Sequence, residues 1–186
     1  MVRLVVLTFL IACAPRPAPA PAPPPPRPSG PLALVEATAD LDGARIGPLG
    51  TGRATVLVVF ASWCPHCQVE LDVLGELRAR HTGVRILGVN YVGHEEYKGR
   101  GNALAVRAYL AEHAPWLRVV PADDELFAAL GRPPKIPTIY IYDRTGALAA
   151  KFDRRERPQP TAAELEEILA RLTEDRSSPR RSSLAP

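Results

Sequence analysis

The chain has 186 residues, of which 46% are hydrophobic and 23% are charged, with a formal net charge of +3 at pH 7. This composition is typical of a single globular domain, and nucleic acid is excluded as an expected partner because no basic run is interleaved with aromatic residues. Three cysteines are too few for a scaffold held together by disulfides, so each of them needs its own explanation.

The first residues of the chain predict an export signal followed by a tether. Residues 4–12 are apolar and follow Arg3. This run is too short to cross a bilayer, which takes about 20 residues, and it is typical of a secretory signal. Leu-Ile-Ala-Cys at residues 10–13 resembles the lipobox of bacterial lipoproteins, which implies a signal peptide of residues 1–12 and a lipid on Cys13. The proline-rich residues 13–31 then favour an extended polyproline II linker.

Residues 32–173 have the composition of a folded domain, and their first half predicts alternating strands and helices. Two short strands on either side of a turn at Asp42-Gly43 predict an N-terminal β-hairpin. The β-branched run at 55–60 predicts a strand buried on both faces, and the apolar spacing over 65–81 predicts a helix with Pro65 near its first turn. Residues 84–92 predict a second strand.

The second half of the domain predicts two helices, a hairpin and a final helix. The helices are expected over 101–115 and 123–131, and the hairpin over 137–153. The final helix, over 161–172, carries the capping-box residues Thr161 and Glu164. Residues 174–186 are expected to be a disordered tail. This order predicts an α/β/α sandwich around a mixed sheet.

Cys64 and Cys67 lie where the first buried strand is expected to run into a helix, in the sequence Trp-Cys-Pro-His-Cys. The N-terminus of a helix stabilises a thiolate, and a gap of two residues lets Cys67 attack a mixed disulfide formed at Cys64. Trp63 is expected to shield one side of the pair. A zinc site is the weaker alternative, because this motif supplies two of the four ligands that zinc needs. Two inert buried thiols are a further alternative.

The domain resembles the thioredoxin fold over nearly all of residues 32–173. Three features carry the resemblance: the sequence Val-Val-Phe-Ala-Ser-Trp-Cys-Pro-His-Cys at 58–67, Ile136-Pro137-Thr138 at the start of the later hairpin, and the order of the strands. The resemblance implies that Pro137 is a cis-proline that faces the cysteine pair. Val58 departs from the family, since many thioredoxins have a buried aspartate six residues before the first cysteine.

The tether, the N-terminal hairpin and the helical insertion before Lys135 are most similar to the membrane-anchored TlpA/ResA group. In that group an acidic residue often stands three residues after the second cysteine, and Glu70 has this position here. The resemblance implies that Glu70 exchanges protons with the thiols; the alternative is a solvated residue of the first helical turn. Pro65-His66 instead resembles the dipeptide of the oxidising enzyme DsbA, in which His66 would stabilise the thiolate.

These features predict a lipid-anchored thiol–disulfide oxidoreductase on the extracytoplasmic, or periplasmic, face of a bacterial membrane. The expected partners are proteins with cysteine thiols or disulfides, an electron donor or acceptor of the envelope, and the membrane itself; no cofactor and no metal are expected. The whole-chain features favour a reductive role of the cytochrome c maturation type. The alternatives are a DsbA-like disulfide-forming oxidase and a non-enzymatic copper metallochaperone. The expected site residues are the catalytic Cys64 and Cys67, the supporting Trp63, Pro65, His66, Glu70 and Pro137, and the lipid-bearing Cys13.

Overall fold

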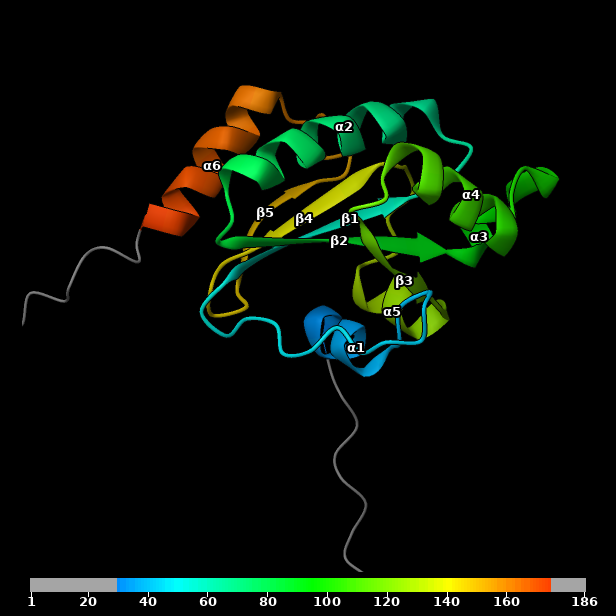
Figure 1. The fold of residues 1–186 in the computed structure, drawn as a ribbon, viewed down its shortest axis with the longest axis horizontal. Helices are drawn as coiled ribbons and strands as arrows, with labels where there is room; N and C mark the ends of the chain where they lie inside the picture. The colour runs from blue at the N-terminus through cyan, green and yellow to red at the C-terminus, as the bar shows by residue number, and fades with distance from the viewer. Residues whose placement is uncertain (1–29, 175–186) are drawn as a thin grey trace, which may run out of the picture.

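The computed structural model describes residues 30–174 (Figure 1). The predicted signal peptide, Cys13, residues 13–29 of the predicted linker and residues 175–186 of the predicted tail lie outside this range. Within the described range, none of the helices has the length and apolar character needed to cross a membrane.

A five-stranded mixed sheet with the order β3-β2-β1-β4-β5 forms the centre of the domain. β1 pairs in parallel with β2 and antiparallel with β4, while β3 and β5 form the two edges. This arrangement confirms the predicted mixed sheet. The strands are β1 (Ala54–Phe60), β2 (Val84–Tyr91), β3 (Arg118–Ala122), β4 (Thr138–Tyr142) and β5 (Leu148–Phe152).

The central strand β1 is buried at every position. Because successive side chains of a strand point to opposite faces, Val56, Val58 and Phe60 belong to one hydrophobic cluster, and Leu57 and Val59 belong to the other. A strand that supplies both cores must be apolar throughout, which confirms the strand predicted from the β-branched run.

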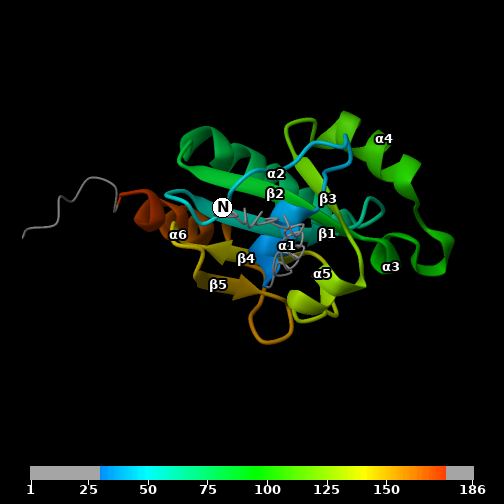
Figure 2. The same cartoon turned by 90° about the horizontal axis from the view of Figure 1, so that it is seen from below.

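Helices cover both faces of the sheet, so the domain has three layers (Figures 1 and 2). Buried side chains of α2 (Pro65–Arg80), α4 (Ala103–His113) and α6 (Ala162–Glu174) pack against one face. On the opposite face, α1 (Pro31–Ala37) and α5 (Asp124–Ala129) contribute Val35 and Leu126 to the second cluster. The cysteine pair belongs to the first cluster.

The predicted N-terminal β-hairpin is wrong in its first half. Residues 31–37 form α1, which carries a proline in its first turn and buries Val35 completely. The predicted turn is present, but only one antiparallel bridge, between Ala39 and Arg45, accompanies it. The side chain of Asp40 accepts hydrogen bonds from backbone N–H groups inside this turn, so a loop replaces a regular strand pair.

The insertion between β2 and Lys135 contains one strand that the sequence pattern did not predict. α3 (Val92–Glu95) and the 3₁₀ helix η1 (Tyr97–Gly99) begin the insertion, and α4 and α5 confirm the two predicted helices. Between them, β3 pairs in parallel with β2. β3 is short and contains Pro121, which a strand tolerates at the edge of a sheet but which weakens its sequence signal.

The predicted hairpin and final helix are both present as β4, β5 and α6. Thr161 accepts a hydrogen bond from the backbone N–H of Glu164, as an N-cap residue does. The carboxylate of Glu164 pairs with Arg157 rather than returning to Thr161. Half of the predicted capping box therefore forms, and the other half becomes a surface ion pair.

Candidate functional site

Cys64 is the N-cap residue of α2. Three residues separate it from the end of β1, and its sulfur accepts a hydrogen bond from the backbone N–H of Cys67 at 3.2 Å. Pro65 occupies the first helical position, where the missing N–H costs nothing and the fixed φ suits the helix. The strand-to-helix junction predicted from the sequence is therefore present, with the first sulfur directly at the helix N-terminus.

The two cysteines differ in burial although both are free thiols. The exposed fraction is 5% for Cys64 and 0% for Cys67. Cys67 lies in the first turn of α2, three residues after Cys64, and belongs to the hydrophobic cluster between α2 and the sheet. Of the two residues, only Cys64 keeps any exposed surface.

Hydrogen bonding and burial move the pKa values of the two thiols in opposite directions. Several effects together lower the pKa of Cys64 to about 7, and the largest of them is a hydrogen bond from the thiol of Cys67. The backbone N–H groups of Cys67 and His66 and the charge of Arg154 also lower it, while burial opposes them. Burial, followed by the hydrogen bond to Cys64, raises the pKa of Cys67. His66 thus acts through its backbone, and its imidazole is exposed.

Trp63 is held rigidly beside Cys64. Its indole N–H lies 3.1 Å from the carbonyl oxygen of His94 and 2.8 Å from that of Glu95. The guanidinium of Arg100 covers the ring at 4.8 Å from the centroid, within the range of a cation–π interaction. The insertion after β2 therefore positions the predicted shielding residue.

Glu95 is a buried carboxylate that the sequence analysis missed. It accepts hydrogen bonds from the backbone N–H of Ser62 at 2.9 Å, from the Ser62 hydroxyl, and from the amide of Asn90 at 2.8 Å. Asn90 also donates to the carbonyl of Phe60 at 3.2 Å. This network ties the end of β2 to the segment before Cys64. A second glutamate follows directly in the sequence, so no local pattern distinguishes the buried one.

Pro137 lies at the end of the sheet that leads to the cysteines. The Ile136–Pro137 peptide bond is cis, as the resemblance to thioredoxins implied. β4 begins at the next residue, Thr138, which pairs with Val59 near the end of β1. The side chain of Ile136 packs against the cluster that contains both cysteines.

A largely apolar cavity of about 390 Å³ lies beside this junction. It is lined by Trp63, His94, Tyr97, Pro134 and Ile136. Burial lowers the pKa of His94, which keeps its imidazole neutral near pH 7. Two of its lining residues, Trp63 and Ile136, directly precede Cys64 and Pro137 in the chain.

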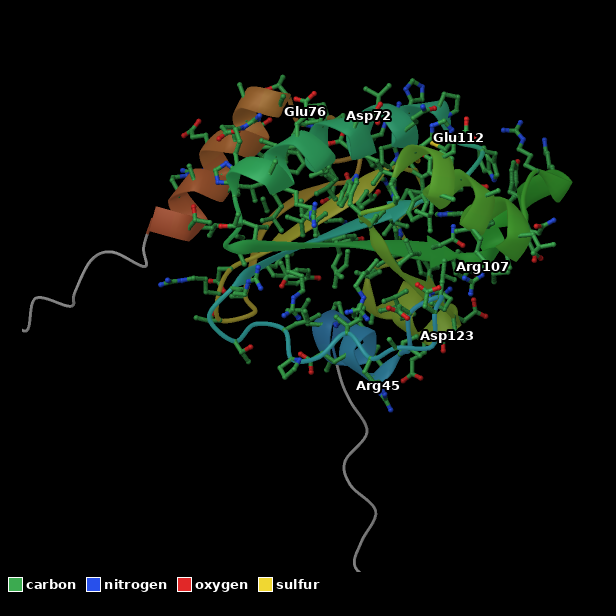
Figure 3. The ribbon with its side chains drawn as sticks, viewed as in Figure 1. Arg45, Asp72, Glu76, Arg107, Glu112 and Asp123 are labelled. Atoms are coloured by element: carbon green, nitrogen blue, oxygen red, sulfur yellow. The ribbon has the colours of Figure 1, made fainter. Side chains whose placement is uncertain are left out.

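Glu70 is buried, with an exposed fraction of 5%. Asp72 and Glu76 of the same helix are directed away from the sheet (Figure 3). The side-chain amide of Gln159 donates to Oε2 of Glu70 at 2.5 Å, whereas Oε1 is buried without a hydrogen-bond partner. Burial raises the pKa of Glu70, and the bond from Gln159 partly offsets this. The alternative of a solvated first-turn residue is therefore wrong.

Arg154, which the sequence analysis did not select, approaches the site from the turn after β5. Its guanidinium donates to the carbonyl of Ile136 at 3.0 Å, and its charge lowers the pKa of both thiols. Several arginines stand close together in this part of the sequence, so only the tertiary structure distinguishes this one.

The described part of the chain contains no group of three or more histidine, cysteine, aspartate and glutamate side chains that is arranged to hold a metal ion. The structure brings together Trp63, Cys64, Pro65, Cys67, Glu70 and the segment around Pro137. The predicted lipid-bearing Cys13 lies outside the described residues.

Solved structures with the same architecture come from several bacteria. A secreted *Mycobacterium tuberculosis* disulfide oxidoreductase homologous to *E. coli* DsbE has a TM-score of 0.58 and 20% identity, covering 72% of this chain and 93% of that chain. A thiol:disulfide interchange protein of the thioredoxin family from *Chlorobium tepidum* has a TM-score of 0.61 and 21% identity, covering 83% and 99%. The chain has a thioredoxin-like fold. StoA from *Bacillus subtilis* is also similar, with a TM-score of 0.55 and 23% identity over 70% and 92%.

Sequence comparison finds a shorter region of similarity. No family model matches the chain. The thiol:disulfide interchange protein DsbE of *Escherichia coli* strain K12 is 42% identical over 43 residues, which is 23% of this chain and 22% of DsbE. DsbE of *Yersinia pestis* matches to the same extent. The similarity therefore spans about a fifth of the length of these curated relatives.

The different pKa values predict selective alkylation of the pair. We expect iodoacetamide to modify Cys64 at a rate that rises through a midpoint near pH 7, because only the thiolate reacts, while Cys67 stays unmodified over the same range. Peptide mapping by mass spectrometry measures each cysteine separately. Cys67→Ala should move the Cys64 midpoint upward, because it removes the largest stabilising hydrogen bond. A midpoint of Cys64 near 9 in the unaltered protein contradicts the expected thiolate.

Proposed function

We propose that this protein is a thiol–disulfide oxidoreductase that acts on the cysteines of exported proteins through Cys64 and Cys67. The observation that carries the proposal is the asymmetry of the pair. Cys64 lies at a helix N-terminus with a pKa of about 7 and keeps a small exposed surface, whereas Cys67 is completely buried and its pKa is raised. The thioredoxin-like fold and the 43-residue match to DsbE support it.

In the reductive direction, the Cys64 thiolate attacks one sulfur of a substrate disulfide. This forms a mixed disulfide and releases the first substrate thiolate, which takes up a proton. Cys67 then loses its proton and attacks the sulfur of Cys64, which releases the second substrate thiolate. Two electrons pass to the substrate and the Cys64–Cys67 disulfide remains. An electron donor of the envelope restores the dithiol; the same steps in reverse oxidise a substrate.

Glu70 is the group that we assign to the deprotonation of Cys67. It stands three residues after Cys67 on the same helix, and residues with this spacing are neighbours on a helix surface. Burial raises the pKa of its carboxyl, which brings its proton affinity closer to that of a thiol. Val58, fully buried in β1, provides no carboxylate from the sheet.

The apolar cavity is the place that we assign to the substrate segment next to the reacting cysteine. Trp63 and Ile136 lie on its wall and also adjoin Cys64 and Pro137 in the chain. A substrate segment bound in the cavity would place the sulfur of its cysteine near Cys64. The side chains next to that cysteine would be buried in the cavity, away from water. The rigid placement of Trp63 by His94 and Glu95 keeps this wall in position.

The location that we propose is the extracytoplasmic face of a bacterial membrane. Residues 1–12 have the pattern of a signal peptide, Cys13 is the proposed lipid attachment site, and residues 13–31 would act as a linker. As a polyproline II segment, this linker would reach about 50 Å from the membrane. The domain could thereby act on protein substrates while staying attached to the membrane, as proteins of the TlpA/ResA group do.

A reductive role, of the cytochrome c maturation type, fits the thiol chemistry better than an oxidising one. The pKa of Cys64, about 7, is similar to that of thioredoxin at about 7, whereas that of DsbA is about 3.5. A less stabilised thiolate gives a less oxidising disulfide. His66 lowers the pKa of Cys64 through its backbone N–H, and its imidazole is exposed to solvent.

Cysteine variants test the assigned roles. Cys64→Ser should abolish the acceleration by this protein of insulin reduction with dithiothreitol, because it removes the attacking sulfur. Cys67→Ser should accumulate mixed disulfides between Cys64 and substrate, visible as bands that disappear on reduction. Insulin reduction by the Cys64→Ser variant at the rate of the unaltered protein contradicts the assignment of the nucleophile.

Glu70→Gln tests the proton acceptor. We expect the release of trapped substrate to slow about tenfold or more near pH 7, because an amide takes up no proton and general base catalysis contributes about 10²–10⁴-fold. The formation of the mixed disulfide at Cys64 should be nearly unchanged. Stopped-flow measurement of the tryptophan fluorescence separates the two steps, and Glu76→Gln on the exposed face of α2 is the control. Equal slowing of both steps contradicts the assigned role.

The reduction potential tests the direction. Equilibration with a glutathione redox buffer should place the Cys64–Cys67 pair near thioredoxin, at about −270 mV, and far from DsbA, at about −120 mV. The fraction of oxidised protein is measured by alkylation and mass spectrometry. A potential close to that of DsbA supports the disulfide-forming oxidase instead.

A further inference from the structure

The turn after β5 and the loop before β4 exchange two hydrogen bonds, and Ile136 of that loop packs against the hydrophobic cluster that contains both cysteines. Nη1 of Arg154 donates to the carbonyl oxygen of Ile136 at 3.0 Å. In return, Nζ of Lys135 donates to the carbonyl oxygen of Arg154 at 3.4 Å. We call Arg154, Lys135 and Ile136 the arginine clasp. Because Ile136 immediately precedes Pro137, the clasp holds the guanidinium against the segment that faces the site.

The backbone at Arg154 is strained and firmly held. Its φ of 58° lies in the left-handed region, which residues other than glycine rarely adopt. Asp153, almost fully buried, accepts hydrogen bonds from the backbone N–H groups of Arg155 and Glu156 and pairs with Lys151 at 2.9 Å. Such strain persists where the surroundings determine the conformation, and it is frequent at functional sites. Glycine would adopt this backbone conformation without strain. The presence of arginine here is therefore explained by its side chain and not by the backbone.

The charge of Arg154 acts on both sulfurs. The guanidinium is half-buried, so water screens its field less than at an open surface, and its charge lowers the pKa of both Cys64 and Cys67. Two further titratable groups belong to this region: the carboxyl of Glu70, three residues after Cys67 on α2, and the hydroxyl of Tyr109 on α4, which interacts with the charges of both thiols. Burial is the largest cause that raises the pKa of each of these two groups.

We propose that Arg154 is a positioning residue: clasped to Ile136, its guanidinium holds a positive charge beside the Cys64–Cys67 pair and favours the dithiol over the disulfide. This inference rests on the proposed thiol–disulfide function. In a glutathione buffer, the protein disulfide and two glutathione thiols give the protein dithiol and one glutathione disulfide, with two electrons transferred. A thiolate exists only on the dithiol side, so a nearby positive charge shifts this equilibrium toward the dithiol.

Charge-removing variants of the full chain test the inference. Arg154→Gln should shift the equilibrium constant with glutathione about threefold toward the disulfide, which corresponds to about 14 mV at 29.6 mV per tenfold change. The pH midpoint of Cys64 alkylation should rise in parallel, because the thiolate loses a stabilising charge. Arg154→Lys keeps the charge and should lie closer to the unaltered protein. Arg155→Gln is the matched control: Arg155 is exposed in the same turn, and its loss should change neither value.

Arg154→Gly distinguishes the effect of losing the guanidinium charge from the effect of destabilising the fold. Glycine adopts the left-handed backbone without strain, so this variant should be no less stable to heat than Arg154→Gln while showing the same shift toward the disulfide. The inference is overturned if Arg154→Gly and Arg154→Gln keep the equilibrium constant and alkylation midpoint of Arg155→Gln. That result would leave the proposed function intact, whereas an unaltered protein that reduces no disulfide would contradict the proposed function itself.

Discussion

The helix N-terminus at Cys64 is the constraint on which the rest of the site depends. β1 is buried on both faces and therefore leaves the core at one defined place, directly before α2. There the sulfur of Cys64 accepts a hydrogen bond from the backbone N–H of Cys67 at 3.2 Å. The thiol of Cys67, and after it the backbone N–H groups of Cys67 and His66, lower the pKa of Cys64 to about 7. Because a thiolate is the reactive form, this local geometry makes one sulfur a nucleophile at neutral pH.

Burial gives the second sulfur a different role. Cys67 belongs to the core cluster, and burial raises its pKa, which favours its thiol form near neutral pH. Two buried carboxylates lie near the pair, and their hydrogen bonds distinguish them. Glu95 accepts from Ser62 and Asn90 and serves the structure of the segment before Cys64, whereas Glu70 has one oxygen without a partner. An incompletely satisfied carboxylate in the core is costly for stability, which is why a chemical role is the more consistent explanation.

Many parts of the fold and the cysteine pair were predictable because they depend on short-range patterns. The apolar run of β1, the helical spacing after Pro65, and the turn before β5 each determine a local conformation, and all three are present. α1 was mistaken for a strand because a segment of seven residues is too short for its periodicity to show. β3 was missed because an edge strand with an internal proline has a weak pattern of its own and is defined by its pairing with β2.

By itself, the sequence determined the strand-to-helix junction, the spacing of the two sulfurs and the proline that opens β4, since all of these are encoded within a few residues of each other. Only the tertiary structure decided which charged side chains serve the site. Gln159 meets Glu70 across 89 residues of sequence, and Arg154 reaches Ile136 across 18. Neither contact leaves a local pattern, because the burial of a carboxylate and the direction of a guanidinium depend on which distant segments fold beside them.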